Sequence, residues 1–193
     1  IYSRRREILE TAKDEEKSSK EQILENLENS ITQIVSIAEV SPDGMSPAEK
    51  IITDFATIIP FDGPSQKELA KQLEQRPEIS GRVEFLFDIT KKMYEQREKQ
   101  VGEKAMRQIE NFVTLSIIDN LWMDHLDVVD NLREGIGLRA YGQKDPLVEY
   151  KNEAFRMFET LINGIDDEIA HRIFKIQIAA PEHQHTHIHE QPA

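Results

Sequence analysis

The sequence predicts an all-α protein: an elongated helical scaffold, a small helical subdomain and a long antiparallel hairpin of two helices. Apolar residues recur three and four positions apart through most of the chain, which is the spacing of one buried helical face. No segment carries a β pattern of any weight. Charged residues make up 31% of the 193 residues and the mean hydropathy is -0.56. These values favour long, solvated helices over a thick globular core.

Composition excludes several classes of protein. The formal charge of -12, from 24 basic and 36 acidic residues, repels phosphates and anionic lipids, so we expect no nucleic-acid partner. The absence of cysteine excludes disulfides, thiol catalysis and cysteine metal sites, and is compatible with a reducing cytosol. No apolar run approaches the ~20 residues that span a bilayer, and the opening IYSRRREILE lacks a signal-peptide pattern. We expect a soluble piece of a longer protein, because the chain begins at Ile1 in a helical pattern.

The chain begins with a short, weakly apolar segment, and a helix with one apolar face follows it. Residues 2–12 carry a few apolar positions, and residues 13–22 carry none, which indicates a solvated joint or an exposed helical turn. A buried helical stripe follows. Its members are Ile23, Leu24, Leu27, Ile31, Ile34, Val35 and Ala38. The segment SPDGMSP, 41–47, ends this helix.

Two further helix starts are predicted from side-chain chemistry. Ser46 with Glu49, and Ser65 with Glu68, have the form of a capping box, in which serine and glutamate satisfy orphan backbone N–H groups. The segment PFDGP, 60–64, is expected as the turn between them. The expected buried positions are Ile51, Ile52, Phe55, Ile58 and Ile59 in the first helix and Leu69, Ala70 and Leu73 in the second. Residues 23–76 therefore read as a cluster of short helices.

The remaining pattern predicts three long helical segments. No proline occurs between Pro77 and Pro146, and Gly102 is the expected weak point, since glycine costs roughly 1 kcal/mol against alanine inside a helix. One stripe has the members Ile109, Phe112, Leu115, Ile118, Trp122, Leu126, Val129 and Leu132, and the next has Leu147, Tyr150, Ala154, Phe158, Leu161, Ile165, Ile169, Ile173 and Ile176. Two stripes of similar length bury each other most simply as an antiparallel hairpin with arms of ~30 residues. Asp145 and Pro146 fit the N-cap and first position of the returning helix.

The interval between the two arms, within LREGIGLRAYGQKDPLVEYK at 132–151, is unusually rich in glycine. A plain turn is one interpretation, but a helix connection needs only ~2 to 8 residues. This one also holds apolar and basic residues, namely Ile136, Leu138, Tyr141, Arg133, Arg139 and Lys144. A solvated turn needs no such apolar groups, so we expect the tip to contact a partner.

The run DNLWMDHLDVVDNLREGIGLRAYGQKDPLVEYKNEAFRMF, 119–158, closely resembles the SecA family, the ATP-driven motors of bacterial preprotein export. The resemblance implies that residues 1–16 end a long scaffold helix, 17–102 form a helical wing domain and 103–179 form a two-helix finger. Residues 180–193, with four alternating histidines, read as a disordered His-rich tail that could capture metal only weakly. The family pattern is closer to LRGYAQKDP, so the small residues Ala140 and Gly142 stand exchanged around Tyr141.

The resemblance also implies roles for individual residues. The finger of the family enters the mouth of the SecYEG channel, and its tip meets the unfolded preprotein. The implied tip contacts are Leu138, Arg139, Tyr141 and Gly142. The first arm is implied to regulate the ATPase of the motor domain, through Trp122 and Arg133. A large core residue is an equally good interpretation of Trp122, and a solvated helix end is the simpler interpretation of Arg133.

The expected location is the cytoplasm, with peripheral contact to the bacterial inner membrane through the channel. No GxxxxGK[ST] phosphate loop occurs, so the ATP and Mg site implied for the parent motor lies outside this chain. We expect no catalytic residue, no cofactor and no metal site here. One alternative is a free-standing helical adaptor that binds partners through its hairpin.

A second alternative is a metal-dependent hydrolase built on acidic residues and one histidine of the first arm, which are Asp124, His125, Asp127 and Asp130. Asp127 and Asp130 share a helix face. However, acidic residues on the polar side of a helix are ordinary, so a packing helix is the simpler interpretation.

Overall fold

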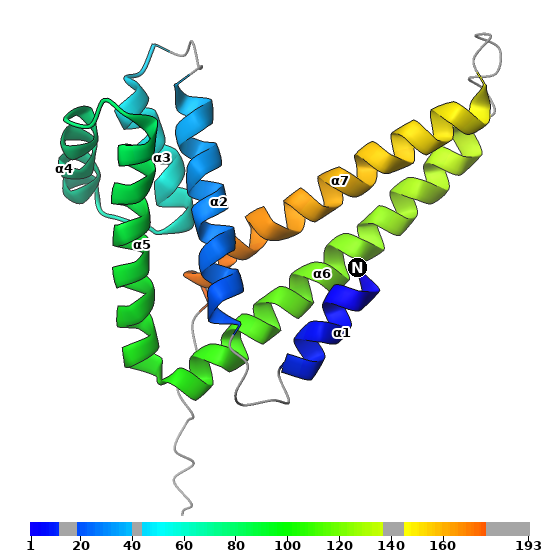
Figure 1. Cartoon of the computed structure of the whole chain (residues 1–193), viewed down its shortest axis with the longest axis horizontal. Helices are drawn as coiled ribbons and strands as arrows, with labels where there is room; N and C mark the ends of the chain where they lie inside the picture. Colours follow the sequence, from blue (N-terminus) through cyan, green and yellow to red (C-terminus); the bar gives the residue numbers. More distant parts are fainter. Residues whose placement is uncertain (12–18, 40–43, 137–144, 177–193) are drawn as a thin grey trace, which may run out of the picture.

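The computed structural model describes residues 1–11, 19–39, 44–136 and 145–176, and within these ranges the chain forms seven α-helices and no strand (Figure 1). The helices are α1 (Tyr2–Thr11), α2 (Lys20–Ala38), α3 (Pro47–Ile58), α4 (Gly63–Glu74), α5 (Ile79–Val101), α6 (Glu103–Gly135) and α7 (Pro146–Ile173). The predicted all-α class is confirmed. The predicted tip residues 137–144 and the tail lie outside the described residues, and the predicted domain boundaries stay a prediction.

Helix α2 lies at the centre of the core. It packs against α3, α5 and the C-terminal part of α7, and it also touches the start of α6. Its fully buried apolar face consists of Ile23, Leu27, Ile31, Val35 and Ala38. These are members of the predicted stripe, while Leu24 and Ile34 lie at its margin and are half-buried.

The start of α3 is confirmed, and the predicted start of α4 was wrong. The Ser46 hydroxyl accepts from the Glu49 N–H at 3.2 Å, and the Glu49 carboxylate accepts from the Ser46 N–H at 3.3 Å, which completes the capping box. Helix α4 begins two residues before Ser65, because the Asp62 carboxylate accepts from the Ser65 N–H at 3.1 Å. Aspartate is as good an N-cap residue as serine, and Pro64 is tolerated in the first turn of a helix. The helix therefore starts after Asp62, the earlier of the two candidate caps.

Gly102 separates α5 from α6. Its backbone has φ 86° and ψ 146°, a conformation that side-chain-bearing residues rarely adopt. The helix ends at Val101 and the next begins at Glu103, so one residue forms the whole connection. The predicted interruption at this glycine is confirmed.

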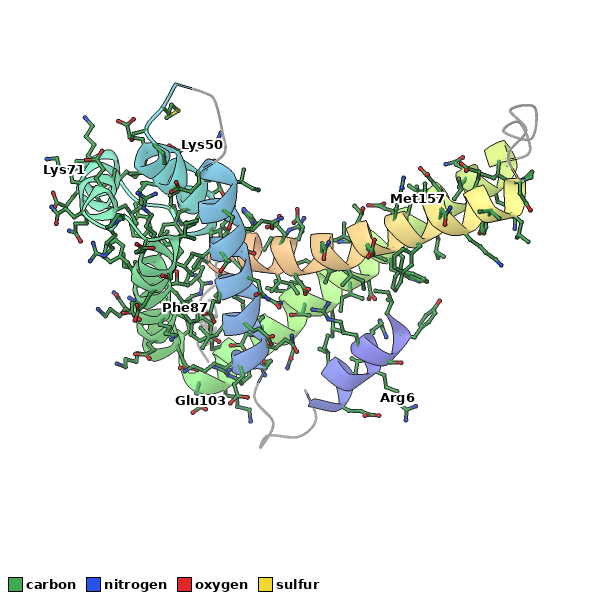
Figure 2. All side chains as sticks on the ribbon, turned by 45° about the horizontal axis from the view of Figure 1, so that its top comes forward. Arg6, Lys50, Lys71, Phe87, Glu103 and Met157 are labelled. Atoms are coloured by element: carbon green, nitrogen blue, oxygen red, sulfur yellow. The ribbon has the colours of Figure 1, made fainter. Side chains whose placement is uncertain are left out.

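Helices α6 and α7 run side by side in opposite directions (Figures 1 and 2). They contain 33 and 28 residues, which corresponds to roughly 50 Å and 42 Å of helix. As predicted, Asp145 caps α7 by accepting from the Leu147 N–H at 2.8 Å, with Pro146 following. The last turns of α7 enter the core with Leu161, Ile165, Ile169 and Ile173 buried.

The predicted stripes of the two arms were partly wrong. Phe112 is 66% exposed, Leu126 47% and Leu147 59%, although all three were expected inside. A step of three residues rotates around a helix by about 60°, and the steps from Ile109 through Phe112 carry the predicted stripe off the buried face. Leu126 and Leu147 are exposed for another reason, because they lie in the outer part of the hairpin, which leaves the core. The base of α6 buries Ile109 and Ile118, as predicted, and also Met106, Val113 and Ile117, which the predicted stripe left out.

The outer part of the hairpin leaves the core. Between Ile118 and Leu161, the part of the chain that the structure describes has only one buried residue, Leu132. We call residues 119–136 and 145–160, which include the outer parts of α6 and α7, the distal hairpin. It extends away from α2–α5 as a narrow pair of rods (Figure 2).

Candidate functional site

Of the twelve large apolar side chains that are exposed among the described residues, seven lie on the distal hairpin. Its exposed large apolar side chains are Met123, Leu126, Val128, Leu147, Val148, Phe155 and Phe158. Exposed large apolar side chains that gather in one region of a protein commonly mark an interaction site. The four predicted tip contacts, Leu138, Arg139, Tyr141 and Gly142, fall between the two arms and outside the described residues.

Trp122 lies in a row of aromatic rings that links three helices. Its indole meets the ring of Tyr2 from α1 edge-on at 5.5 Å and stacks on His125 at 5.5 Å. The His125 ring then meets Phe158 of α7 at 6.1 Å. We call these four residues the aromatic row. Trp122 is half-buried in it, so the packing role considered for this residue is present.

Two arginines of α1 attach the same helix to both arms. The Arg5 guanidinium binds both carboxylate oxygens of Asp119 in α6, at 2.7 Å and 3.2 Å. Arg4 donates to Asp166 of α7 at 2.5 Å. The hydrogen bond and charge of Asp119 raise the pKa of Arg5 above its ordinary value. The aromatic row and these two ion pairs together hold α1 against the hairpin.

Arg133 has a different environment. Its side chain is 72% exposed and pairs with Asp130 of the same helix at 3.2 Å, a contact that contributes little at such exposure. Trp122 lies eleven positions earlier, or roughly 16 Å along the helix. The structure therefore does not bring these two predicted regulatory residues together.

A polar cluster occupies the junction of α2, α5 and α6. We call it the polar joint, and it consists of Ser19, Lys20, Tyr94, Glu98, Arg107 and Glu110. Fully buried Glu110 accepts from the Tyr94 hydroxyl on one oxygen and from the Ser19 hydroxyl on the other. Arg107 lies 3.1 Å from Glu110 and also donates to Glu98, which accepts from Lys20 at 2.7 Å.

Burial and charge shift the pKa values in the polar joint. Burial raises the pKa of Glu110, and the donors around it only partly offset this. Burial, together with the charge of Glu110, also raises the pKa of Tyr94 well above its usual range. Burial alone would raise the pKa of Glu98, but the Lys20 hydrogen bond and the charges of Arg107 and Lys20 hold it below its usual value.

Arg97 ties the end of α5 to the end of α7. Its guanidinium donates to the Phe174 carbonyl at 2.9 Å and to the Ile176 carbonyl. These carbonyls follow the last turn of α7 and have no partner within that helix. Burial lowers the pKa of Arg97 from its ordinary value.

Sequence reasoning missed the polar joint and the contacts of α1. One signal was present for Glu110, because a charged residue follows Ile109 inside the buried spacing of α6. Another signal was the run of three arginines at residues 4–6, which suggests acidic partners elsewhere in the chain. Neither signal names a partner, since Arg4 and Asp166 are separated by 162 positions.

Within the described ranges, no three His, Asp or Glu side chains gather closely enough to hold a metal ion. Across those same residues, none of the helices combines the length and apolar content required to cross a bilayer.

The chain resembles known proteins along nearly its whole length. A family model described as the SecA wing and scaffold domain matches residues 1–177. The protein translocase subunit SecA of Pelotomaculum thermopropionicum is 39% identical over 189 residues, which cover 95% of this chain and 20% of that protein. SecA of Desulforamulus reducens is 37% identical over 188 residues, 94% of this chain and 20% of the relative. SecA of Chlorobium phaeobacteroides is 38% identical over 193 residues, 96% of this chain and 17% of the relative. The chain spans about a fifth of the length of these relatives.

Proposed function

The chain belongs to the SecA family, whose wing and scaffold domain it contains, and we propose that it forms the mechanical part of a protein translocase subunit. Relatives of this chain carry the name protein translocase subunit SecA, and the chain corresponds to about a fifth of their length. The ATP and Mg site of the motor belongs to the remainder of the protein. This chain contributes the lever and the contact surface.

The distal hairpin is the part proposed to act on the transported chain. The observation that carries this proposal is a pair of long helices that leaves the core and exposes apolar side chains along its outer half. Hydrogen-bonded helices transmit displacement because they are stiff, while apolar and aromatic groups contact varied sequences without demanding one of them. The proposed polypeptide contacts at the tip are Leu138, Arg139, Tyr141 and Gly142, and the proposed partner at the membrane is the SecYEG channel.

The first arm is proposed to restrain the ATPase of the parent's motor domain. The exposed guanidinium of Arg133 can reach an acidic surface outside this chain. Trp122 is already packed against Tyr2 and His125, so its influence would pass through the position of α1. The two residues would then act separately, one by direct contact and the other by packing.

The proposed location is the cytoplasm, with peripheral attachment to the inner membrane through the channel. The formal charge of -12 disfavours direct attachment to anionic lipid. Unfolded preprotein, the channel and the motor domain are therefore the proposed partners, and nucleic acid is not among them.

Crosslinking tests the contact with the transported chain. A photoreactive amino acid at Tyr141 of the full-length protein should crosslink to a preprotein during ATP-driven export, and to the channel. The same group at Lys71, exposed on α4, is the matched control and should give neither product. Equal products at both positions, or none at Tyr141, would contradict the finger role. Products with other partners but no preprotein would favour a free-standing adaptor.

ATPase rates test the regulatory role. In the full-length protein, Arg133→Glu and Trp122→Ala should each raise the basal rate, because each weakens a restraint on the motor. Lys151→Glu, at another exposed position of the distal hairpin, changes charge without touching either residue and should leave the rate unchanged. If both variants had the same basal rate as the unsubstituted full-length protein, the regulatory role would be excluded.

A further inference from the structure

We propose that the polar joint is a latch that fixes the direction of the α6–α7 hairpin relative to helices α2–α5. It lies where α5 and α6 meet at the base of the hairpin (Figure 1). The inference concerns the geometry of this chain alone and goes beyond the proposed transport role, because it would hold for an adaptor as well.

The covalent connection does not set this direction by itself. Helices α5 and α6 are joined by the single residue Gly102. A Cβ at that position would meet no atom within 4 Å, so no neighbouring group fixes the connection from the side where a side chain would point. A glycine in open space permits a range of backbone angles. Contacts beyond the connection must therefore select one of them.

The polar joint supplies such contacts as a closed ring. Starting at α2, it runs from Lys20 to Glu98 of α5, then to Arg107 and Glu110 of α6, and back to Ser19 beside Lys20. The negative charges of Glu98 and Glu110 are matched in number by the positive charges of Lys20 and Arg107. Apolar attraction does not depend on direction, whereas hydrogen bonds weaken steeply when their angles change. Rotating α6 against α5 would separate opposite charges in a partly buried place.

Tyr94 adds a second attachment of α5 to α6. Its side chain is fully buried, and its hydroxyl donates to the Glu110 oxygen that Ser19 does not use. Glu110 thus joins α2, α5 and α6 through one carboxylate. Glu110 is the centre of the latch.

The same face of α5 also holds the second arm of the hairpin. Tyr94, Arg97 and Glu98 are spaced three and four positions apart and share one side of the helix. Arg97 donates to carbonyls at the end of α7, while its two neighbours contact α6. The last turns of α5 therefore position both arms, and the hairpin moves as a unit only when both sets of bonds release.

Distance measurements between spin labels test this proposal. The chain contains no native cysteine, so Lys71→Cys on α4 and Lys151→Cys on the distal hairpin place one label on each side of the joint. The doubly labelled protein without any further substitution, called the parent in this comparison, should give one narrow distance distribution. Tyr94→Phe and Glu110→Gln should each broaden it or add a second distance. Tyr150→Phe removes a hydroxyl from a half-buried tyrosine of α7 and should leave the distribution unchanged.

Folding is monitored in the same samples by helical circular dichroism. Tyr94→Phe removes a single oxygen atom, so it decides the question if Glu110→Gln fails to fold. A parent-like distribution in folded Tyr94→Phe and Glu110→Gln would overturn the latch. Broadening of equal size in Tyr150→Phe would also overturn it, because the effect would not be specific to the joint.

Discussion

Glu110 is the residue whose environment most constrains its chemistry. A carboxylate with no exposed surface is stable only when its oxygens are hydrogen-bonded and its charge is paired. Tyr94, Ser19 and Arg107 meet both conditions. Removing one of these donors should therefore cost more than removing a comparable group elsewhere.

We predict that Tyr94→Phe lowers the free energy of unfolding by about 1–3 kcal/mol, because Glu110 loses a buried hydrogen-bond donor. Urea unfolding followed by circular dichroism measures the change. Tyr150→Phe is the matched control, with an expected effect within about 0.5 kcal/mol. If both variants match the parent, the hydroxyl of Tyr94 does not stabilise the fold.

The two carboxylates of the polar joint should respond to pH in opposite ways. The lowered pKa of Glu98 means that its stabilising contribution is present above the ordinary value of 4.5 and is lost as the pH falls through the lowered pKa. The stability difference between the parent and Glu98→Gln should therefore shrink as the solution is acidified below 4.5. The raised pKa of Glu110 has the reverse sign, so the parent should gain stability relative to Glu110→Gln as the pH falls through that raised pKa towards 4.5.

Urea unfolding at several pH values measures both differences on the same scale. The informative quantity is the difference between each variant and the parent, because the other titrating groups cancel in it. Parallel pH profiles for the parent and both variants would contradict the environments described for these two carboxylates.

Among the elements, Gly102 provides the clearest link between a residue and the shape of the chain. We predict that Gly102→Ala lowers the free energy of unfolding by about 1–3 kcal/mol, because alanine is strained at this backbone conformation. No neighbouring atom would clash with the new methyl group, so the effect isolates the backbone. Thermal or urea unfolding measures it.

Gly164 is the matched control within α7. It lies inside a helix, and a Cβ there would also meet nothing within 4 Å. Gly164→Ala should stabilise the chain by about 0.5–1 kcal/mol, since alanine loses less conformational freedom in a helix. Effects of the same sign at both glycines would show that the backbone angle at Gly102 is not what matters.

Some helix boundaries were predictable from the sequence, whereas the buried face of α6 and the contacts between helices were not. The starts at Ser46 and Asp145 and the break at Gly102 were predictable because each depends on a few consecutive residues. The exposed Phe112 was not, because which face of α6 is buried depends on how α2, α5 and α7 surround its base. The partners of Arg97 and Glu110 were hidden for the same reason, since they come from other helices.

On the scale of the whole molecule, α1 connects the first residues of the chain to the middle of the hairpin. It packs along α6, where Tyr2 meets Trp122, and Arg4 reaches Asp166 of α7. The Arg4–Asp166 pair is half-buried and the Arg5–Asp119 pair is exposed, so solvent still screens both. Edge-on ring contact adds to the area that the rings bury, so we expect ring packing to provide most of the attachment. The docking of α1 should therefore depend more on Tyr2 than on either arginine.

The chain contains a single tryptophan, so its fluorescence reports the docking of α1 directly. We predict that Tyr2→Ala shifts the Trp122 emission to longer wavelength and increases its quenching by acrylamide, because the indole loses its covering ring. Arg4→Ala should change both quantities less, and Tyr150→Phe should change neither. If Tyr2→Ala left the emission and quenching of the parent intact while Arg4→Ala altered them, the ion pairs rather than the aromatic row would hold α1. Any influence of Trp122 on a motor domain would then depend on the ion pairs that Arg4 and Arg5 form with the hairpin. The regulatory effect of Trp122→Ala should in that case disappear at high salt, which screens ion pairs.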